Sequence, residues 1–205
     1  MAGGELRRQA ILEAMIRVAG DKGYQATSVA DVLVEAGASR TTFYKHFDDK
    51  HDCFLAAYEL VVERVLAAAV AGCAEREDWP AAALDGLAAV VELFVREPEL
   101  ARTAVVEAAV AGVRARRRQG AAIDSLARLL DEGWGPRRRP QLPASTALMA
   151  VSGVVGLMFD RLQAGRADEL PQLLPELEFA LLVPFVGPRA AIGEISPSPE
   201  RSESL

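Results

Sequence analysis

Residues 36–50 carry the sequence AGASRTTFYKHFDDK, which follows a short apolar segment. Ser39 is a residue type that caps helix N-termini, and Gly37 permits the backbone turn that separates two short helices. Phe43 and Phe47 are four residues apart, so they share one face of the second helix and are expected in the core. A short helix, a turn with glycine and another short helix predict a helix-turn-helix.

The outward side of the second of these helices is expected to carry hydroxyl, amine and imidazole groups. The helical period assigns to this side Thr41, Thr42, Tyr44, Lys45 and His46. Such groups contact phosphates and base edges in DNA. Segment 36–47 has no acidic residue, although the whole chain has a net charge of −6. A small cationic face on an acidic protein is therefore expected. The overall charge argues only against a protein that coats nucleic acid without specificity.

The rest of the chain predicts helices as well. A first helix is expected to end at residues 20–23, Ser28 and Asp31 predict a capping box at the start of the second, and Asp49 predicts the cap of a long fourth helix. Beyond it, apolar residues recur at three- and four-residue spacing, so the expected fold class is all-α, with about nine helices. The later helices are expected over 80–96, 98–111, 114–132, 143–163 and 171–186.

The composition supports a packed protein with two units. Hydrophobic residues make up 51% of the 205 residues and charged residues 25%, which is enough apolar material for a core. We expect a helix-turn-helix domain at 1–52, a larger helical body at 53–187 and a disordered tail at 188–205. The tail is expected because proline, serine and glutamate are frequent there.

Several classes of protein are disfavoured. No stretch of about 20 residues is apolar enough to span a bilayer, and the N-terminus lacks the apolar region of a signal peptide. Two cysteines are too few for a dense disulfide framework, so a cytoplasmic location is expected. Cys53 and Cys73 are interpreted as buried small hydrophobic residues, with redox sensing as the alternative. His46, His51 and Cys53 lie close in sequence but lack a fourth ligand at suitable spacing. We therefore expect no metal, no cofactor and no enzymatic activity.

The motif at 36–50, preceded by GYQATSV at 23–29, resembles the tetracycline-repressor (TetR) family of bacterial transcription regulators. The resemblance covers roughly residues 8–56. It departs from the family at Thr41, where glycine is frequent, and at His51, where glutamate is frequent. The resemblance implies a homodimeric repressor with an N-terminal DNA-binding domain and a C-terminal domain that binds a small molecule. Its expected partners are double-stranded operator DNA, a second copy of the chain and an unknown effector, with no membrane.

The resemblance also implies which residues contact DNA. Thr27 and Ser28 would start the supporting helix near the phosphate backbone, and Lys50 would contact a phosphate at the start of the fourth helix. Ser39 and Thr27 could instead serve only as caps, and His46 could only pack against the fourth helix. The positions that match the recognition helix are Ser39, Arg40, Thr41, Thr42, Tyr44 and His46.

The helical body is expected to enclose an apolar effector cavity, because it is rich in alanine and valine with few fixed polar groups. Arginine runs at 114–118 and 137–139 are interpreted as solvated faces, with recognition of an anionic effector such as an acyl-coenzyme A as the alternative. The candidate wall residues, which could also be plain core, are Trp79, Phe94, Trp134, Met158 and Phe159.

The last two expected helices are predicted to form the homodimer as a four-helix interface. The first offers small residues that allow close approach, and the second offers apolar residues at helical spacing. The alternative functions are a small-molecule-binding or interaction protein whose helix-turn-helix is structural, and a regulator that acts as an activator. The residues expected at the interface are Ser145, Ser152, Gly153 and Gly156, then Leu173, Leu174, Leu177, Leu181, Leu182 and Phe185.

Overall fold

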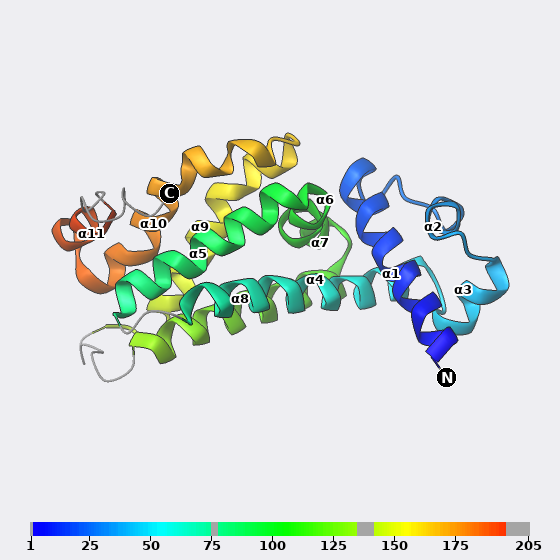
Figure 1. Ribbon diagram of the computed structural model, residues 1–205, viewed down its shortest axis with the longest axis horizontal. Helices are drawn as coiled ribbons and strands as arrows, with labels where there is room; N and C mark the ends of the chain where they lie inside the picture. The colour runs from blue at the N-terminus through cyan, green and yellow to red at the C-terminus, as the bar shows by residue number, and fades with distance from the viewer. Residues whose placement is uncertain (1, 75–77, 135–141, 196–205) are drawn as a thin grey trace.

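The computed structural model of the chain describes residues 2–74, 78–134 and 142–195, and these form helices joined by turns, without a strand (Figure 1). The all-α expectation is confirmed. In chain order the helices are α1 Ala2–Lys22, α2 Val29–Ala36, α3 Arg40–His46, α4 Lys50–Cys73, α5 Trp79–Arg96, α6 Pro98–Arg102, the π-helix η1 Thr103–Glu107, α7 Ala108–Val110, α8 Val113–Trp134, α9 Thr146–Gln163, the 3₁₀ turn η3 Ala167–Glu169, α10 Leu170–Val186 and α11 Pro188–Ile195.

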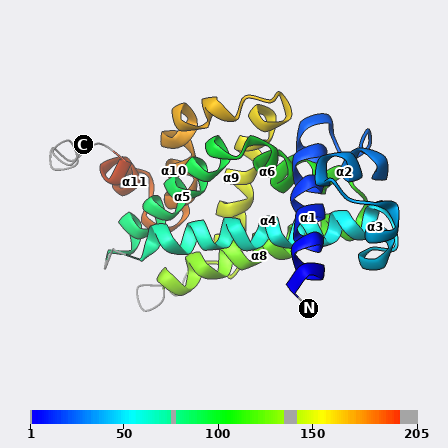
Figure 2. The same ribbon diagram turned by 45° about the vertical axis from the view of Figure 1, so that its right-hand side comes forward.

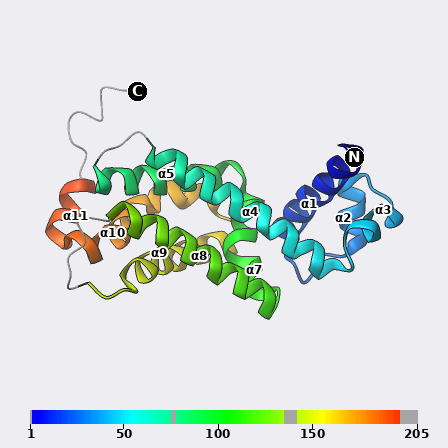
Figure 3. The same cartoon turned by 90° about the horizontal axis from the view of Figure 1, so that it is seen from below.

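The first three helices form a module at one end of an elongated molecule (Figure 1). Helix α1 packs against α2 and crosses α4 (Figure 2). Helix α4 continues from the module into the body, where it lies beside α5 and α8. The body is completed by α9 and α10, with α11 at the end farthest from the module (Figure 3). The expected boundary between residues 52 and 53 falls inside α4, so the division into domains remains an interpretation.

The module folds where its local signals predict. The Ser28 side chain accepts a hydrogen bond from the backbone N–H of Asp31, whose carboxylate accepts one from the N–H of Ser28, which completes the capping box. Gly37 closes α2 in the left-handed region, with φ of 59°, where glycine carries no steric cost. Phe43 and Phe47 are buried, as expected.

Two parts of the body differ from the expectation. The helix expected over 98–111 is divided into α6, η1 and α7, because five residues of it adopt π-helical hydrogen bonding. The disordered tail expected from residue 188 is wrong for residues 188–195, which form α11 and bury Ala191 against the body. The remainder of that tail, 196–205, lies outside the described residues.

In the part of the chain that the structure describes, no helix is both long enough and apolar enough for a membrane crossing.

Candidate nucleic-acid interface and internal cavity

Helix α3 presents an exposed polar face at the tip of the module. Arg40, Thr41, Tyr44 and Lys45 are exposed, and 55% of the Tyr44 side-chain surface is accessible. The Tyr44 ring stands edge-on to the Phe43 ring, with centroids 5.3 Å apart, so the buried ring of Phe43 supports it from below. Because α3 ends in Lys45 and a half-buried His46 and has no acidic residue in its first turn, this face is suited to an anionic partner.

Three of the expected contact residues make local hydrogen bonds. The Ser39 hydroxyl accepts from the backbone N–H of Thr42 at 3.1 Å and shares a hydrogen bond with the Thr42 hydroxyl at 2.9 Å. The Ser28 hydroxyl lies 2.6 Å from the Asp31 carboxylate, to which it donates. Ser39 and Ser28 are therefore helix caps, and both remain exposed. The ring of His46 lies 6.2 Å from that of Phe47.

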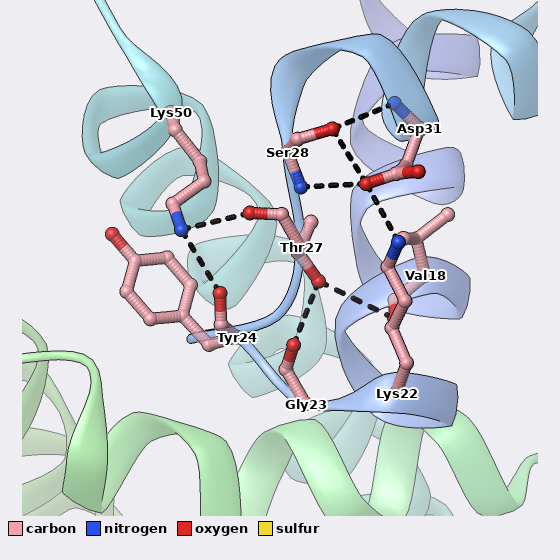
Figure 4. A network of polar contacts seen from close by, with 8 residues as sticks. All are labelled: Val18, Lys22, Gly23, Tyr24, Thr27, Ser28, Asp31 and Lys50. Carbon is pink, nitrogen blue, oxygen red and sulfur yellow. Dashed lines mark hydrogen bonds and ion pairs between the residues drawn. The ribbon is translucent and has the colours of Figure 1, made fainter.

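Thr27 does not lie on the surface. Its side chain is 3% exposed, and its hydroxyl donates to the carbonyl oxygen of Gly23 at 2.8 Å and lies 3.5 Å from that of Val18 (Figure 4). The expectation that this side chain contacts phosphate is therefore wrong for this conformation. The hydroxyl bonds to the turn that follows α1, where the Gly23 carbonyl oxygen also accepts the backbone N–H of Thr27, because a buried hydroxyl without a partner is costly.

Lys50, the first residue of α4, is hydrogen-bonded to the connection between α1 and α2. Its ammonium donates to the carbonyl oxygens of Tyr24 at 3.0 Å and Thr27 at 2.8 Å, and it lies 4.3 Å from the centroid of the Tyr24 ring (Figure 4). An ammonium has three N–H donors, so one remains for a partner outside the chain. The expected phosphate contact is thus at most a second role of this half-buried side chain.

The module meets the body at a buried carboxylate. Glu107, the last residue of η1, is 3% exposed and accepts the backbone N–H of Tyr24 at 2.7 Å. It also forms an ion pair with the Nε of Arg102 at 3.1 Å, and Arg102 donates to the carbonyl oxygen of Asp21 at 2.9 Å. These contacts compensate the burial of the charge and fix the turn after α1 to the body.

Other contacts of α6, η1 and α7 reach the same end of α1. The Thr103 hydroxyl is fully buried and donates to the carbonyl oxygen of Ile16 at 3.3 Å. The Gln25 amide donates to the carbonyl oxygen of Val110 at 3.2 Å. Gly20 lies so close to Glu99 that a Cβ on Gly20 would sit 2.2 Å from the Glu99 carbonyl oxygen. The segment 98–110 is therefore tightly packed against the module.

The body contains a cavity of about 710 Å³ between α4, α5, η1, α8, α9 and α10, lined mainly by apolar side chains. Trp79, Phe94, Trp134 and Met158 line it, as expected. Phe159 does not: it is partly buried against the core, because it follows Met158 on α9 and a helix turns by about 100° per residue.

Polar groups gather where the cavity meets η1. The Tyr58 hydroxyl donates to the carbonyl oxygen of Ala104 at 3.3 Å, and the Gln119 amide donates to those of Ala104 and Val105 at 3.1 and 2.9 Å. All four residues line the cavity, and burial raises the pKa of Tyr58 well above its ordinary value, so its hydroxyl stays protonated. This group was not predicted from the sequence, although Gln119 lies at the start of the apolar stripe of α8 formed with Ile123, Leu126 and Leu130.

Among the described residues that line the cavity there is no cation, and Glu132 is the one with a charged side chain. The first arginine run lies on α8: Arg114, Arg116 and Arg117 are exposed, and Arg118 pairs with Glu59. These positions agree with solvated faces. The second run, 137–139, lies outside the described residues.

The cysteines and histidines do not assemble a reactive site. Burial, with the nearby Asp52 carboxylate, raises the pKa of the Cys53 thiol to about 12, and burial beside Asp85 also raises that of Cys73. Nδ1 of His51 lies 3.2 Å from the Tyr24 hydroxyl. Within the ranges that the structure describes, no group of His, Cys, Asp and Glu side chains is suited to hold a metal ion.

The expected dimer helices differ from each other. On α9, Ser152, Gly153 and Gly156 are exposed, and open space surrounds both glycines. On α10, the assignment to the interface is wrong for five residues, because their side chains face α5 and α9 inside the subunit and are at most 9% exposed. These are Leu173, Leu177, Leu181, Leu182 and Phe185.

Comparison with known proteins agrees with this architecture. Residues 11–57 match the family model described as "Bacterial regulatory proteins, tetR family". No curated protein matches the chain. Among solved structures, TylP, a TetR regulator from Streptomyces fradiae, is 21% identical with a TM-score of 0.72, and the alignment covers 97% of this chain and 94% of that one. FadR from Bacillus subtilis, solved in complex with stearoyl-CoA, is 16% identical with a TM-score of 0.72, covering 87% and 98%. A TetR family regulator from Marinobacter aquaeolei is 22% identical with a TM-score of 0.63, covering 87% and 93%.

At these identities the solved structures show the shared fold, and the family model matches the part of the chain that contains the helix-turn-helix. Residues 11–57 therefore carry the helix-turn-helix of the tetR family of bacterial regulatory proteins, and the whole chain has the fold of TetR-family transcription regulators.

Proposed function

We propose that the protein is a transcription repressor that binds a palindromic operator as a homodimer and is released by a small, largely apolar effector. The observation that carries this proposal is the continuity between cavity and module. Ala104 and Val105 line the cavity, whereas Thr103 and Glu107 of the same π-helix are hydrogen-bonded to the module. A ligand that changes the shape of the cavity wall therefore acts on the element that positions the DNA-binding helices.

The DNA-contacting surface in this proposal is the exposed face of α3. Arg40, Thr41, Tyr44 and Lys45 reach the major groove, and base-edge contacts from Arg40 and Thr41 select the sequence. The flanking residues Ser28, Ser39, Thr42 and His46 lie beside this face, and Lys50 offers its third N–H to a phosphate. Thr27 acts indirectly, because its buried hydroxyl holds the turn between α1 and α2. Two copies of α3 in a dimer would enter successive major grooves about 34–36 Å apart.

The second copy of the chain is proposed to dock on α9. Besides its small residues, the helix exposes Met149 and Leu157, and α10, which packs against α9, exposes Phe179. Large apolar side chains at the surface next to glycines allow two helices to approach closely and bury apolar area. The interface would be isologous about a two-fold axis, which matches a palindromic operator.

Release follows from linkage. An effector that binds more tightly to the conformation that the operator disfavours lowers operator affinity, by the same factor by which the operator lowers effector affinity. The related fold of FadR from Bacillus subtilis was solved with stearoyl-CoA, which supports a ligand-binding role for the body. Here the cavity wall lacks described cations, so we place only an uncharged ligand portion inside it. A bacterial protein that binds operator DNA acts in the cytoplasm, which is the location included in this proposal.

Selection of bound sequences from a random pool of DNA tests the proposal. We expect enrichment of a palindrome and a complex with a two-subunit stoichiometry by light scattering. Failure to enrich any sequence by the folded protein would favour the alternative of a binding or interaction protein with a structural helix-turn-helix. A reporter fused to the selected site then separates a repressor, which lowers expression, from an activator, which raises it.

A further inference from the structure

The π-helix η1 lies between two sets of hydrogen bonds. Its backbone is wider than an α-helix, and the N–H of Ala108 reaches back five residues to the carbonyl oxygen of Thr103. On the cavity side, the carbonyl oxygens of Ala104 and Val105 accept from the side chains of Tyr58 and Gln119. Such π-helical insertions are rare and frequently lie at functional sites.

The hydrogen-bonding capacity left at this end of the cavity is that of acceptors. The Gln119 amide nitrogen already donates to two carbonyl oxygens, and the Tyr58 hydroxyl donates its one proton to Ala104. What remains is the Gln119 carbonyl oxygen and the lone pairs of the Tyr58 oxygen, and at the Val105 carbonyl oxygen a ligand donor would take the place of the Gln119 amide. A ligand group placed among them must therefore donate a hydrogen bond.

We propose that Gln119 and Tyr58, with the Val105 carbonyl, form the subsite for the hydroxyl or amide N–H of an uncharged effector whose apolar body fills the rest of the cavity. This inference rests on the proposed effector role of the cavity. The wall provides apolar surface from all the surrounding helices, and the one charged side chain described in it, Glu132, repels a carboxylate. A ligand group that lacks a donor leaves these acceptors unpaired, which lowers its affinity.

The same subsite connects the ligand to DNA binding. A donor that engages the Val105 carbonyl competes with Gln119 for one of the hydrogen bonds that hold η1 in its π-helical form. Glu107, two residues further along, holds the backbone of Tyr24. A change in the winding of η1 therefore moves the carboxylate that fixes the turn after α1.

Three ten-carbon probes test the assignment: 1-decanol, decyl methyl ether and decanoate. The chain has two tryptophans, Trp79 and Trp134, and both line the cavity, so intrinsic fluorescence reports binding without a label. Decanol donates a hydrogen bond, whereas the ether only accepts, so we expect decanol to bind about threefold to tenfold more tightly. Decanoate should bind more weakly than decanol, because the described wall holds no cation to compensate its charge.

The variant Gln119→Met removes the amide and keeps the length of the side chain. Leu126→Met, on the same face of α8, introduces the same residue and removes no hydrogen bond. We expect the ratio of decanol to ether affinity to fall to about one in Gln119→Met and to persist in Leu126→Met, whatever the change in absolute affinity. Circular dichroism and operator binding without ligand confirm that both variants are folded.

The assignment is overturned if wild-type protein binds decanol no better than the ether, absence of binding included, or if the ratio survives in Gln119→Met. Operator release, measured in parallel, distinguishes this outcome from failure of the proposed function. A Gln119-dependent ratio without any release of operator supports the subsite and contradicts the repressor model. If decanol and the ether bind equally well and both release the operator, the subsite is contradicted and the repressor model is not.

Discussion

The module and the body use their polar groups in opposite ways. In the module, the side chains of Thr27, Ser28 and Lys50 are occupied with backbone groups around the end of α1 and the start of α2, and the outward face of α3 is left free. In the body, the polar groups of Tyr58 and Gln119 point inward, to a π-helix beside a large cavity. The first arrangement suits a rigid surface that is read by a partner, and the second suits a core that a ligand can remodel.

The largest expected effect is on the module itself. Phe43 is fully buried and contacts the rings of both Tyr44 and Phe47. Phe43→Ala should lower the free energy of unfolding of the module by about 3–5 kcal/mol and abolish DNA binding, because the cavity left behind cannot close in so small a core. Chemical denaturation measures this destabilisation. An unchanged denaturation profile would show that α3 is not anchored by this ring.

The next prediction concerns the contact between the module and the body, where Gly20 of α1 packs against Glu99 of α6. Gly20→Ala places a methyl group against the backbone of Glu99, and the backbone cannot yield as a flexible side chain does. We expect the free energy of unfolding to fall by about 1–3 kcal/mol, the range for overpacking. Gly4→Ala on the same helix is the control, because nothing lies within 4 Å of its Cβ position and alanine favours a helix. Equal effects of the two variants would contradict a tight joint.

A third prediction tests the exposed face of α3 as the DNA-contacting surface, without a change in the body. Arg40 is exposed on the first turn of α3, so Arg40→Ala should leave the free energy of unfolding unchanged and alter the preferred operator sequence. The expected cost in binding free energy is about 1–3 kcal/mol for each base pair that Arg40 reads. Titrations on the selected operator and on scrambled DNA measure it. A uniform decrease in affinity for both DNAs would assign Arg40 to phosphate rather than to a base.

The contrast between the regions also explains what could be predicted from sequence. The caps at Ser28, Ser39 and Asp49 and the burial of Phe43 follow from signals within four residues, so the module could be derived from its sequence. The inward turn of the Thr27 hydroxyl depends on carbonyls at the end of α1, nine and four residues away, which local patterns do not reveal.

In the body, the decisive features depend on packing between distant segments. The π-helix carries no proline or glycine, and its carbonyls are satisfied by Tyr58 and Gln119 from two other helices. The leucines of α10 show the same spacing whether they face a core or a second subunit, so their burial could not be predicted from period alone. Phe159 and Met158 are adjacent in sequence, and only the rotation of α9 decides which of them reaches the cavity.

A fourth prediction separates the two roles of Lys50. Lys50→Met removes the two hydrogen bonds to the connection between α1 and α2, so we expect the free energy of unfolding of the module to fall by about 1 kcal/mol. If its third N–H also contacts a phosphate, the slope of log affinity against log salt should fall by about 0.9 per half-site. Lys45→Met, at an exposed position, should change the salt slope without changing stability. A stability of Lys50→Met equal to that of wild type would contradict the structural role.

The smallest effect is expected at the exposed cap of α2. The Lys22 ammonium lies 2.6 Å from the Asp31 carboxylate, which also accepts hydrogen bonds from Ser28, and these contacts hold the pKa of Asp31 well below its ordinary value. A carboxyl whose pKa is lowered on folding stabilises the folded state above its unfolded pKa, about 3.9, and this contribution declines as the pH falls toward the folded pKa. Asp31→Asn should therefore be less stable than wild type at pH 7, and the difference should shrink below about pH 4. Denaturation curves from pH 7 to pH 3 measure the difference, and one that stays constant with pH would assign the effect to the shape of the side chain rather than to its charge.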